Sequence, residues 1–60
     1  MNTELPKDPM MLLSVINLKL RDFYPSLDEL CSDMGIDEDE LCTKLLSIEY
    51  EYDKSLNKFV

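Results

Sequence analysis

Several residue types that build common active sites are absent or scarce in this 60-residue chain. It has no histidine and no tryptophan, only two cysteines, and six basic residues against 13 acidic ones. Without histidine, the chain cannot form a serine–histidine or cysteine–histidine nucleophile. Two cysteines alone also supply fewer ligands than a structural or catalytic zinc requires. The sequence therefore predicts a protein that is not an enzyme and has no catalytic residues, no metal and no cofactor.

The chain also lacks a secretory signal pattern and any long apolar run. A membrane-spanning helix needs about 20 predominantly apolar residues in a row. We therefore expect a cytoplasmic protein with no membrane contact. Its formal net charge of −7 argues against nucleic acid as a partner, because phosphates and carboxylates repel each other. No stretch indicates a cleft for a small molecule, so we expect a protein partner.

The apolar content, 45% of the residues, is sufficient for one small folded domain. Residues 1–7 are polar and contain Pro6, so they are expected to form an arm with Leu5 as its one apolar anchor.

Asp8 and Pro9 are typical of a helix start, since aspartate can cap a helix and proline suits its first position. Pro25 prevents a long extension, and a first helix is predicted over residues 9–23. The side of this helix assigned to the core consists of Leu12, Leu13, Ile16, Leu20 and Phe23.

Two shorter helices are predicted on either side of the single glycine, Gly35. Ser26 with Glu29, and Asp37 with Glu40, have the spacing of capping boxes, which mark helix starts. Gly35 can take the left-handed backbone conformation that ends a helix. These signals predict helices over residues 26–34 and 38–48. Both cysteines fall on the inward faces and are interpreted as core residues.

The spacing around Gly35 resembles a helix-turn-helix motif. Cys31 is a small residue four positions before the glycine, and Ile36, Leu41 and Leu45 can fill the space between the two helices. The motif predicts an architecture, because a fold does not determine a function. In DNA-binding versions the outer face of the second helix enters the major groove. Here that face is acidic, and it consists of Asp37, Glu38, Asp39, Glu40, Thr43, Lys44 and Ser47.

After Ile48 the pattern changes to the alternation that is typical of a half-buried strand. Tyr50 and Tyr52 alternate with acidic residues, and residues 53–57 (DKSLN) favour a turn. A β-hairpin is therefore predicted over residues 50–60. The fold class that follows is mainly α with a small C-terminal β-hairpin, a three-helix, helix-turn-helix domain of winged-helix-like type.

The predicted first helix has a second apolar stripe, formed by Met11, Val15 and Leu18, on the side away from its core face. One interpretation is that the hairpin or the arm covers this stripe, and the other is that the protein self-associates through it. A polar stripe beside it contains the most site-like residues of the chain, Ser14, Asn17 and Arg21. Arg21 can bind a carboxylate with two hydrogen bonds, although a surface ion pair with a nearby acid is the simpler interpretation.

Nearly the whole chain resembles a family of short bacterial proteins known as domain of unknown function 4250. The resemblance rests on residues 5–14 (LPKDPMMLLS), Asn17, residues 19–22 (KLRD), residues 26–31 (SLDELC) and residues 50–60 (YEYDKSLNKFV). It implies a stand-alone bacterial cytoplasmic protein, and no activity, substrate or cofactor. Glu49 departs from the broader winged-helix pattern, in which a glycine often ends the third helix.

Two functions are considered from the sequence. The first is a non-enzymatic module that binds protein, above all a second copy of itself as a homodimer, through Met11, Val15 and Leu18. The alternative is a transcriptional regulator that binds DNA as a dimer through the predicted 38–48 helix and the hairpin. Its candidate contacts are Lys44, Lys54 and Lys58.

Overall fold

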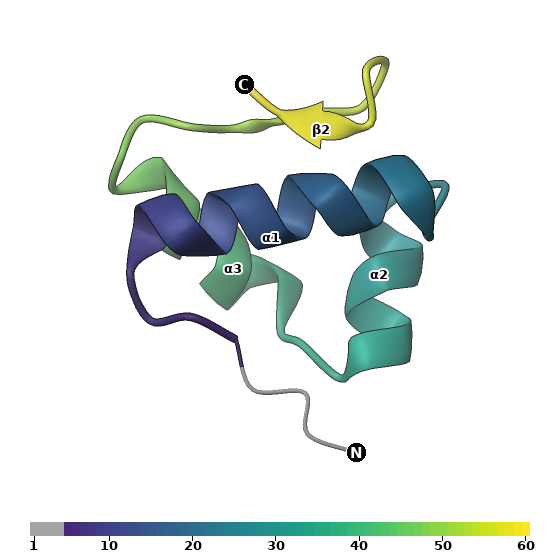
Figure 1. Ribbon diagram of the computed structural model, residues 1–60, viewed down its shortest axis with the longest axis horizontal. Coiled ribbons are helices and arrows are strands. Elements are labelled where there is room, and N and C mark those ends of the chain that lie inside the picture. Colours follow the sequence, from purple (N-terminus) through teal and green to yellow (C-terminus); the bar gives the residue numbers. More distant parts are fainter. Residues whose placement is uncertain (1–4) are drawn as a thin grey trace.

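The computed structural model describes residues 5–60 and contains three helices followed by a two-stranded antiparallel hairpin. The elements are α1 (Pro9–Asp22), α2 (Leu27–Met34), α3 (Glu38–Leu46), β1 (Tyr52–Asp53) and β2 (Lys58–Phe59). Helix α1 lies across the middle of the molecule, with the hairpin on one side and α2 and α3 on the other (Figure 1). The predicted fold class, mainly α with a small C-terminal β-hairpin, is thus confirmed. Most of the predicted N-terminal arm, residues 1–4, lies outside the described part of the chain.

Ser26 and Asp37 cap the starts of α2 and α3 as the sequence predicts, although within residues 5–60 neither Glu29 nor Glu40 makes the return bond of a capping box. The Ser26 hydroxyl accepts a hydrogen bond of 3.2 Å from the backbone N–H of Glu29. Asp37 Oδ1 accepts hydrogen bonds from the N–H groups of Asp39 (2.9 Å) and Glu40 (3.2 Å). Each bond satisfies a backbone donor that has no partner within its own helix.

The start of α1 is different, and the predicted aspartate cap is wrong in its detail. Asp8 occupies the N-cap position and Pro9 is the first helical residue, but the Asp8 side chain makes no capping hydrogen bond. The Asp8 backbone carbonyl accepts the first helical hydrogen bond, from the N–H of Leu12 at 2.8 Å. The Asp8 carboxylate is therefore exposed at one end of α1 with no role in the cap.

Helix α2 ends as expected, at a left-handed glycine. Gly35 has a φ of +67°, and the N–H of Ile36 bonds to the carbonyl of Cys31 at 2.9 Å. This turn leads directly into the cap of α3, so α2 and α3 are joined by only three residues.

Helix α3 ends two residues earlier than predicted, and a glutamate takes the conformation usually left to glycine. Glu49 has a φ of +65°, which few residues other than glycine adopt. The N–H of Glu49 bonds to Leu46 O at 2.8 Å, and the N–H of Tyr50 bonds to Leu45 O at 3.1 Å. These two bonds form a Schellman motif. The absent glycine therefore leaves the turn into the hairpin intact.

One buried cluster connects all three helices with β2. It contains Leu12, Leu13, Ile16, Leu20, Leu27, Leu30, Cys31, Leu41, Leu45 and Phe59. Four of the five predicted core residues of α1 are in this cluster. The fifth, Phe23, was assigned to the core wrongly: its side chain is 69% exposed. Phe23 follows the last residue of α1 and has a φ of −126°, so the helical spacing used to place it no longer applies.

The hairpin covers the core with its inward-facing aromatic residues. Tyr52 is paired with Phe59, and their ring centroids are 5.5 Å apart. Asp53 shapes the turn by accepting hydrogen bonds from the N–H groups of Ser55 and Leu56. Its bonds with the Ser55 hydroxyl and these N–H groups lower the pKa of the Asp53 carboxyl.

Candidate interaction surface

The outer stripe, which is Met11, Val15 and Leu18, lies on the side of α1 away from the core. Met11 is 59% exposed and Leu18 is 47% exposed, while Val15 is half-buried. In the described part of the chain, neither the hairpin nor the arm buries the two ends of this stripe. Two large apolar side chains therefore remain in solvent, two helical turns apart.

Asn17 lies on a different side of α1 and holds the hairpin in place. Its Nδ2 donates to the carbonyl oxygen of Phe59 at 3.1 Å, and its Oδ1 accepts from the N–H of Phe59 at 2.8 Å. In an antiparallel ladder, residue pairs that exchange backbone hydrogen bonds alternate with pairs that do not. Glu51 and Val60 exchange two such bonds, so the next pair, Tyr52 and Phe59, exchanges none. The polar groups of Phe59 therefore point away from β1 and toward α1. The amide of Asn17, which the sequence indicated as a surface group, therefore bonds within the chain through both its nitrogen and its oxygen.

A second polar connection links the hairpin to the ends of two helices. Asn57 Nδ2 donates to the backbone carbonyls of Leu20 and Tyr24, both at 3.0 Å. Asn57 Oδ1 accepts from the Tyr52 hydroxyl at 2.7 Å, and that hydroxyl accepts from the N–H of Leu27 at 3.2 Å. Sequence spacing gave no signal for this connection, because its members are up to 37 residues apart.

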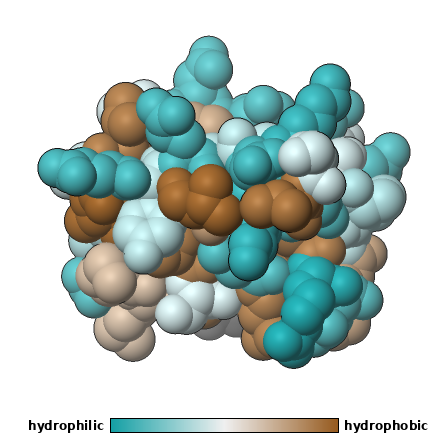
Figure 2. All heavy atoms as spheres, turned by 90° about the horizontal axis from the view of Figure 1, so that it is seen from above, coloured by the Kyte–Doolittle hydropathy of each residue, from teal (hydrophilic) through white to brown (hydrophobic). Residues whose placement is uncertain are grey.

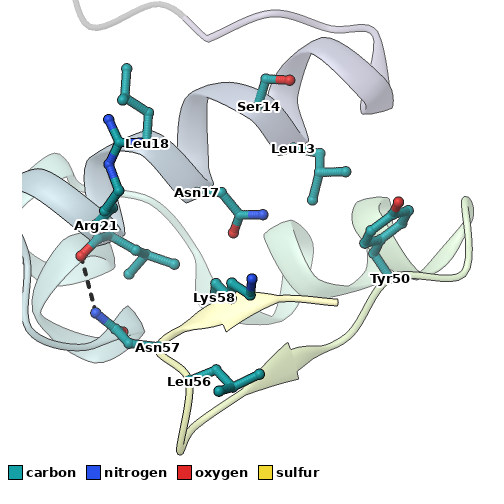
Figure 3. A pocket seen from close by; sticks show the side chains of 10 residues that line it. Leu13, Ser14, Asn17, Leu18, Arg21, Tyr50, Leu56, Asn57 and Lys58 are labelled. Atoms are coloured by element: carbon teal, nitrogen blue, oxygen red, sulfur yellow. Dashed lines mark hydrogen bonds between the residues drawn. The ribbon is translucent and has the colours of Figure 1, made fainter.

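Between α1 and the hairpin lies an open groove of about 800 Å³. It is lined by Leu13, Ser14, Asn17, Leu18, Leu20, Arg21, Tyr50, Leu56, Asn57 and Lys58. Four of the six residues singled out from the sequence therefore line one groove, while Met11 and Val15 do not. Figure 3 shows Leu13 and Asn17 directed toward the hairpin, whereas Leu18 and Arg21 extend from α1 on the side away from it. Viewed from the hairpin side, exposed apolar residues form several separate groups among hydrophilic ones (Figure 2).

Arg21 forms an ion pair with its neighbour in the chain. Its Nε and Nη2 donate to the two carboxylate oxygens of Asp22 at 3.0 and 3.1 Å. These hydrogen bonds raise the pKa of the Arg21 guanidinium and lower that of the Asp22 carboxyl. Both side chains are exposed, so the pair has the character of the simple surface ion pair considered above.

The two thiols are poorly suited to nucleophilic chemistry. Cys31 is buried, and its burial, followed by the negative charge of Glu38, raises its pKa to about 11. Burial and the charges of Glu38 and Asp39 also raise the pKa of Cys42, which is half-buried. A thiol reacts as its thiolate, so both cysteines are less reactive than a free one at neutral pH. Within residues 5–60, no three potential metal ligands come together, and no helix could cross a bilayer.

The outer face of α3 is exposed along its length. It forms a shallow depression of about 500 Å³, lined by Asp39, Glu40, Thr43, Lys44 and Ser47. Two carboxylates and one ammonium group do not provide the positive charge on which phosphate contacts depend. The arrangement does not favour DNA binding by this helix.

Together, the three helices and the small antiparallel hairpin define a small, mainly helical protein with an exposed apolar stripe on α1. The chain belongs to the family described as Domain of unknown function (DUF4250), whose model matches residues 6–59. This confirms the resemblance seen in the sequence, and it assigns no activity. No curated protein and no solved structure matched the chain.

Proposed function

We propose that this protein is a non-enzymatic module that self-associates through the outer stripe of α1. The observation that carries the proposal is the exposure of Met11 (59%) and Leu18 (47%) on one side of the same helix. Removing apolar surface from water favours association, and the surplus over the entropy that two copies lose on pairing appears as affinity. An isologous pairing uses the same stripe on both copies, so each exposed residue is covered by the other copy.

The distribution of charge supports a second copy of the chain as the partner at this face. Residues 24–60 carry ten acidic and three basic residues, whereas residues 7–23 carry two acidic and three basic ones. Two copies of a protein with a net charge of −7 repel each other over most of their surface. The region around α1 is therefore a part of the chain where this repulsion is small.

Catalysis is not part of the proposal. The raised pKa values of Cys31 and Cys42 oppose a thiolate nucleophile.

The proposal is tested by the solution mass from light scattering over a wide range of protein concentration. We expect the wild type to dimerise, and Leu18→Glu to remain a folded monomer, because the substitution places a charge on a side chain that the second copy covers. Leu46→Glu is the matched control, since Leu46 is a leucine of similar exposure (52%) on α3. It should dimerise like the wild type.

Two results would overturn self-association through this stripe. A wild type that stays monomeric at every concentration would exclude self-association. A Leu46→Glu variant that dissociates as readily as Leu18→Glu would show that the outer stripe of α1 is not the interface. Circular dichroism of each variant ensures that a loss of mass reflects dissociation of folded protein.

A further inference from the structure

We propose, on the basis of the self-association above, that two copies pair antiparallel along α1, with Asp8 of each copy facing Lys19 of the other. The proposal defines the orientation of the second copy and the ion pairs that fix it. It follows from the position of the outer stripe, the unused Asp8 carboxylate and the distribution of charge along α1.

The two ends of α1 carry opposite charges on the same flank. Asp8 stands at the N-terminal end, and its carboxylate is exposed and makes no capping bond. Helix α1 has no acidic residue in its first turn and has Lys19 and Arg21 in its last. Arg21 is already paired with Asp22, whereas Lys19 has no carboxylate partner within residues 5–60 and its Nζ lies 5.8 Å from the centre of the Phe23 ring.

Helix geometry places these charges beside the outer stripe. Successive residues are rotated by about 100° around the helix axis, so Asp8 and Lys19, 11 positions apart, differ in direction by only about 20°. Both residues therefore lie on one flank of α1, roughly 16 Å apart along the axis. The centre of the stripe falls between Ser14 and Val15, midway between Met11 and Leu18.

A two-fold axis through that centre brings the two sets of residues together. It places Met11 of one copy against Leu18 of the other, and it leaves Asp8 offset from Lys19 of the second copy by only about 3 Å along the axis. The lysine side chain spans such an offset easily. Ser14 lies near the axis, where its small side chain allows the helices to approach closely.

The opposite orientation is electrostatically unfavourable. A parallel pair about a two-fold axis along the helices would place Asp8 and Lys19 of the two copies on opposite flanks of the interface, so neither ion pair could form. It would also align the two helix dipoles. The charge pattern of α1 therefore selects the antiparallel arrangement.

The test uses charge reversal in the full chain, with dimer dissociation constants measured by sedimentation at low salt. Asp8→Lys and Lys19→Glu should each raise the constant by on the order of tenfold, because each homodimer then contains two like-charged pairs. The double variant Asp8→Lys/Lys19→Glu restores both pairs with reversed sign. Its constant should return to within about threefold of the wild-type value.

Net charge provides matched controls. Asp8→Lys makes the protein less negative, which by itself would strengthen dimerisation, so a weaker dimer has to come from the local pair. Glu51→Lys and Lys44→Glu change the net charge by the same amounts at exposed positions outside α1.

The result separates this inference from the proposed function. A wild type that never dimerises would refute both. A wild type that dimerises while Asp8→Lys and Lys19→Glu match their controls, or a double variant that stays as weak as the single ones, would refute the antiparallel pairing and leave self-association standing.

Discussion

Asn17 and Phe59, 42 residues apart in the chain, are joined by two hydrogen bonds between one side-chain amide and one backbone peptide position. The amide of Asn17 provides both a donor and an acceptor, as a neighbouring strand would. An open strand edge can template pairing with other chains. In this hairpin, Asn17 bonds to the N–H and the carbonyl of the buried residue Phe59, and it thereby occupies the edge of β2 that faces away from β1.

Replacing Asn17 with alanine should strongly destabilise the protein. The change leaves the N–H and the carbonyl of Phe59 without partners at a part-buried site, and each unsatisfied group costs about 1–3 kcal/mol. We expect the free energy of unfolding in urea to fall by about 2–4 kcal/mol. Ser14→Ala, at an exposed position on the same helix, should change it by less than about 0.5 kcal/mol. Equal effects of the two substitutions would show that the two bonds to Phe59 contribute little.

Replacing Glu49 with glycine should stabilise the protein. The left-handed conformation costs a residue other than glycine about 1–2 kcal/mol, and the greater freedom of glycine in the unfolded chain offsets about 0.5–1 kcal/mol of this gain. The expected net gain in the free energy of unfolding is about 0.5–1 kcal/mol. Glu49→Ala removes the same side chain and keeps the unfavourable conformation, so it should give no gain. A loss of stability in Glu49→Gly would contradict this account.

The two thiols should react slowly and at different rates with an alkylating reagent. With a pKa of about 11, roughly one Cys31 thiol in a thousand is ionised at pH 8, against about one in four for an ordinary cysteine. Cys31 is also the more buried of the two, so Cys42 should be modified first. The rate at Cys31 should rise as the pH approaches 11, since only the thiolate reacts.

Peptide mass spectrometry of partly alkylated protein distinguishes the two sites. In guanidinium chloride both cysteines should react at the same fast rate, because unfolding removes the burial. Equal rates in the native protein would indicate that Cys31 is not protected by the core.

The predictions from sequence succeeded where the signal is local. Ser26 and Asp37 cap the helices that follow them, and Gly35 ends α2, because each role depends on backbone groups within a few residues. The period of the apolar residues likewise located the buried side of α1 correctly at Leu12, Leu13, Ile16 and Leu20.

The predictions failed where the outcome depends on the chain geometry just beyond a helix end. Phe23 continues the apolar pattern of α1 but follows its last helical residue, so its side chain points into solvent. Glu49 carries no sequence signal for a left-handed turn. It adopts one because the bonds from Glu49 to Leu46 and from Tyr50 to Leu45 satisfy the carbonyls at the end of α3.

The candidate surface was only partly visible in the sequence. The second apolar stripe could be recognised from its spacing, but its exposure depends on where the hairpin packs. That position is set by Asn17 and Asn57, which bond to groups 33 to 42 residues away. Long-range bonds of this kind have no periodic pattern.

The bonds from Asn17 to Phe59 also bear on the order in which the chain folds. Joining residues that are 42 positions apart requires closing a long loop, and the entropy lost on closure grows with loop length. Contacts among the three helices connect closer residues and close shorter loops. We therefore expect the helices to assemble first and the hairpin to dock last, so that undocking of the hairpin is the lowest-energy opening of the native state.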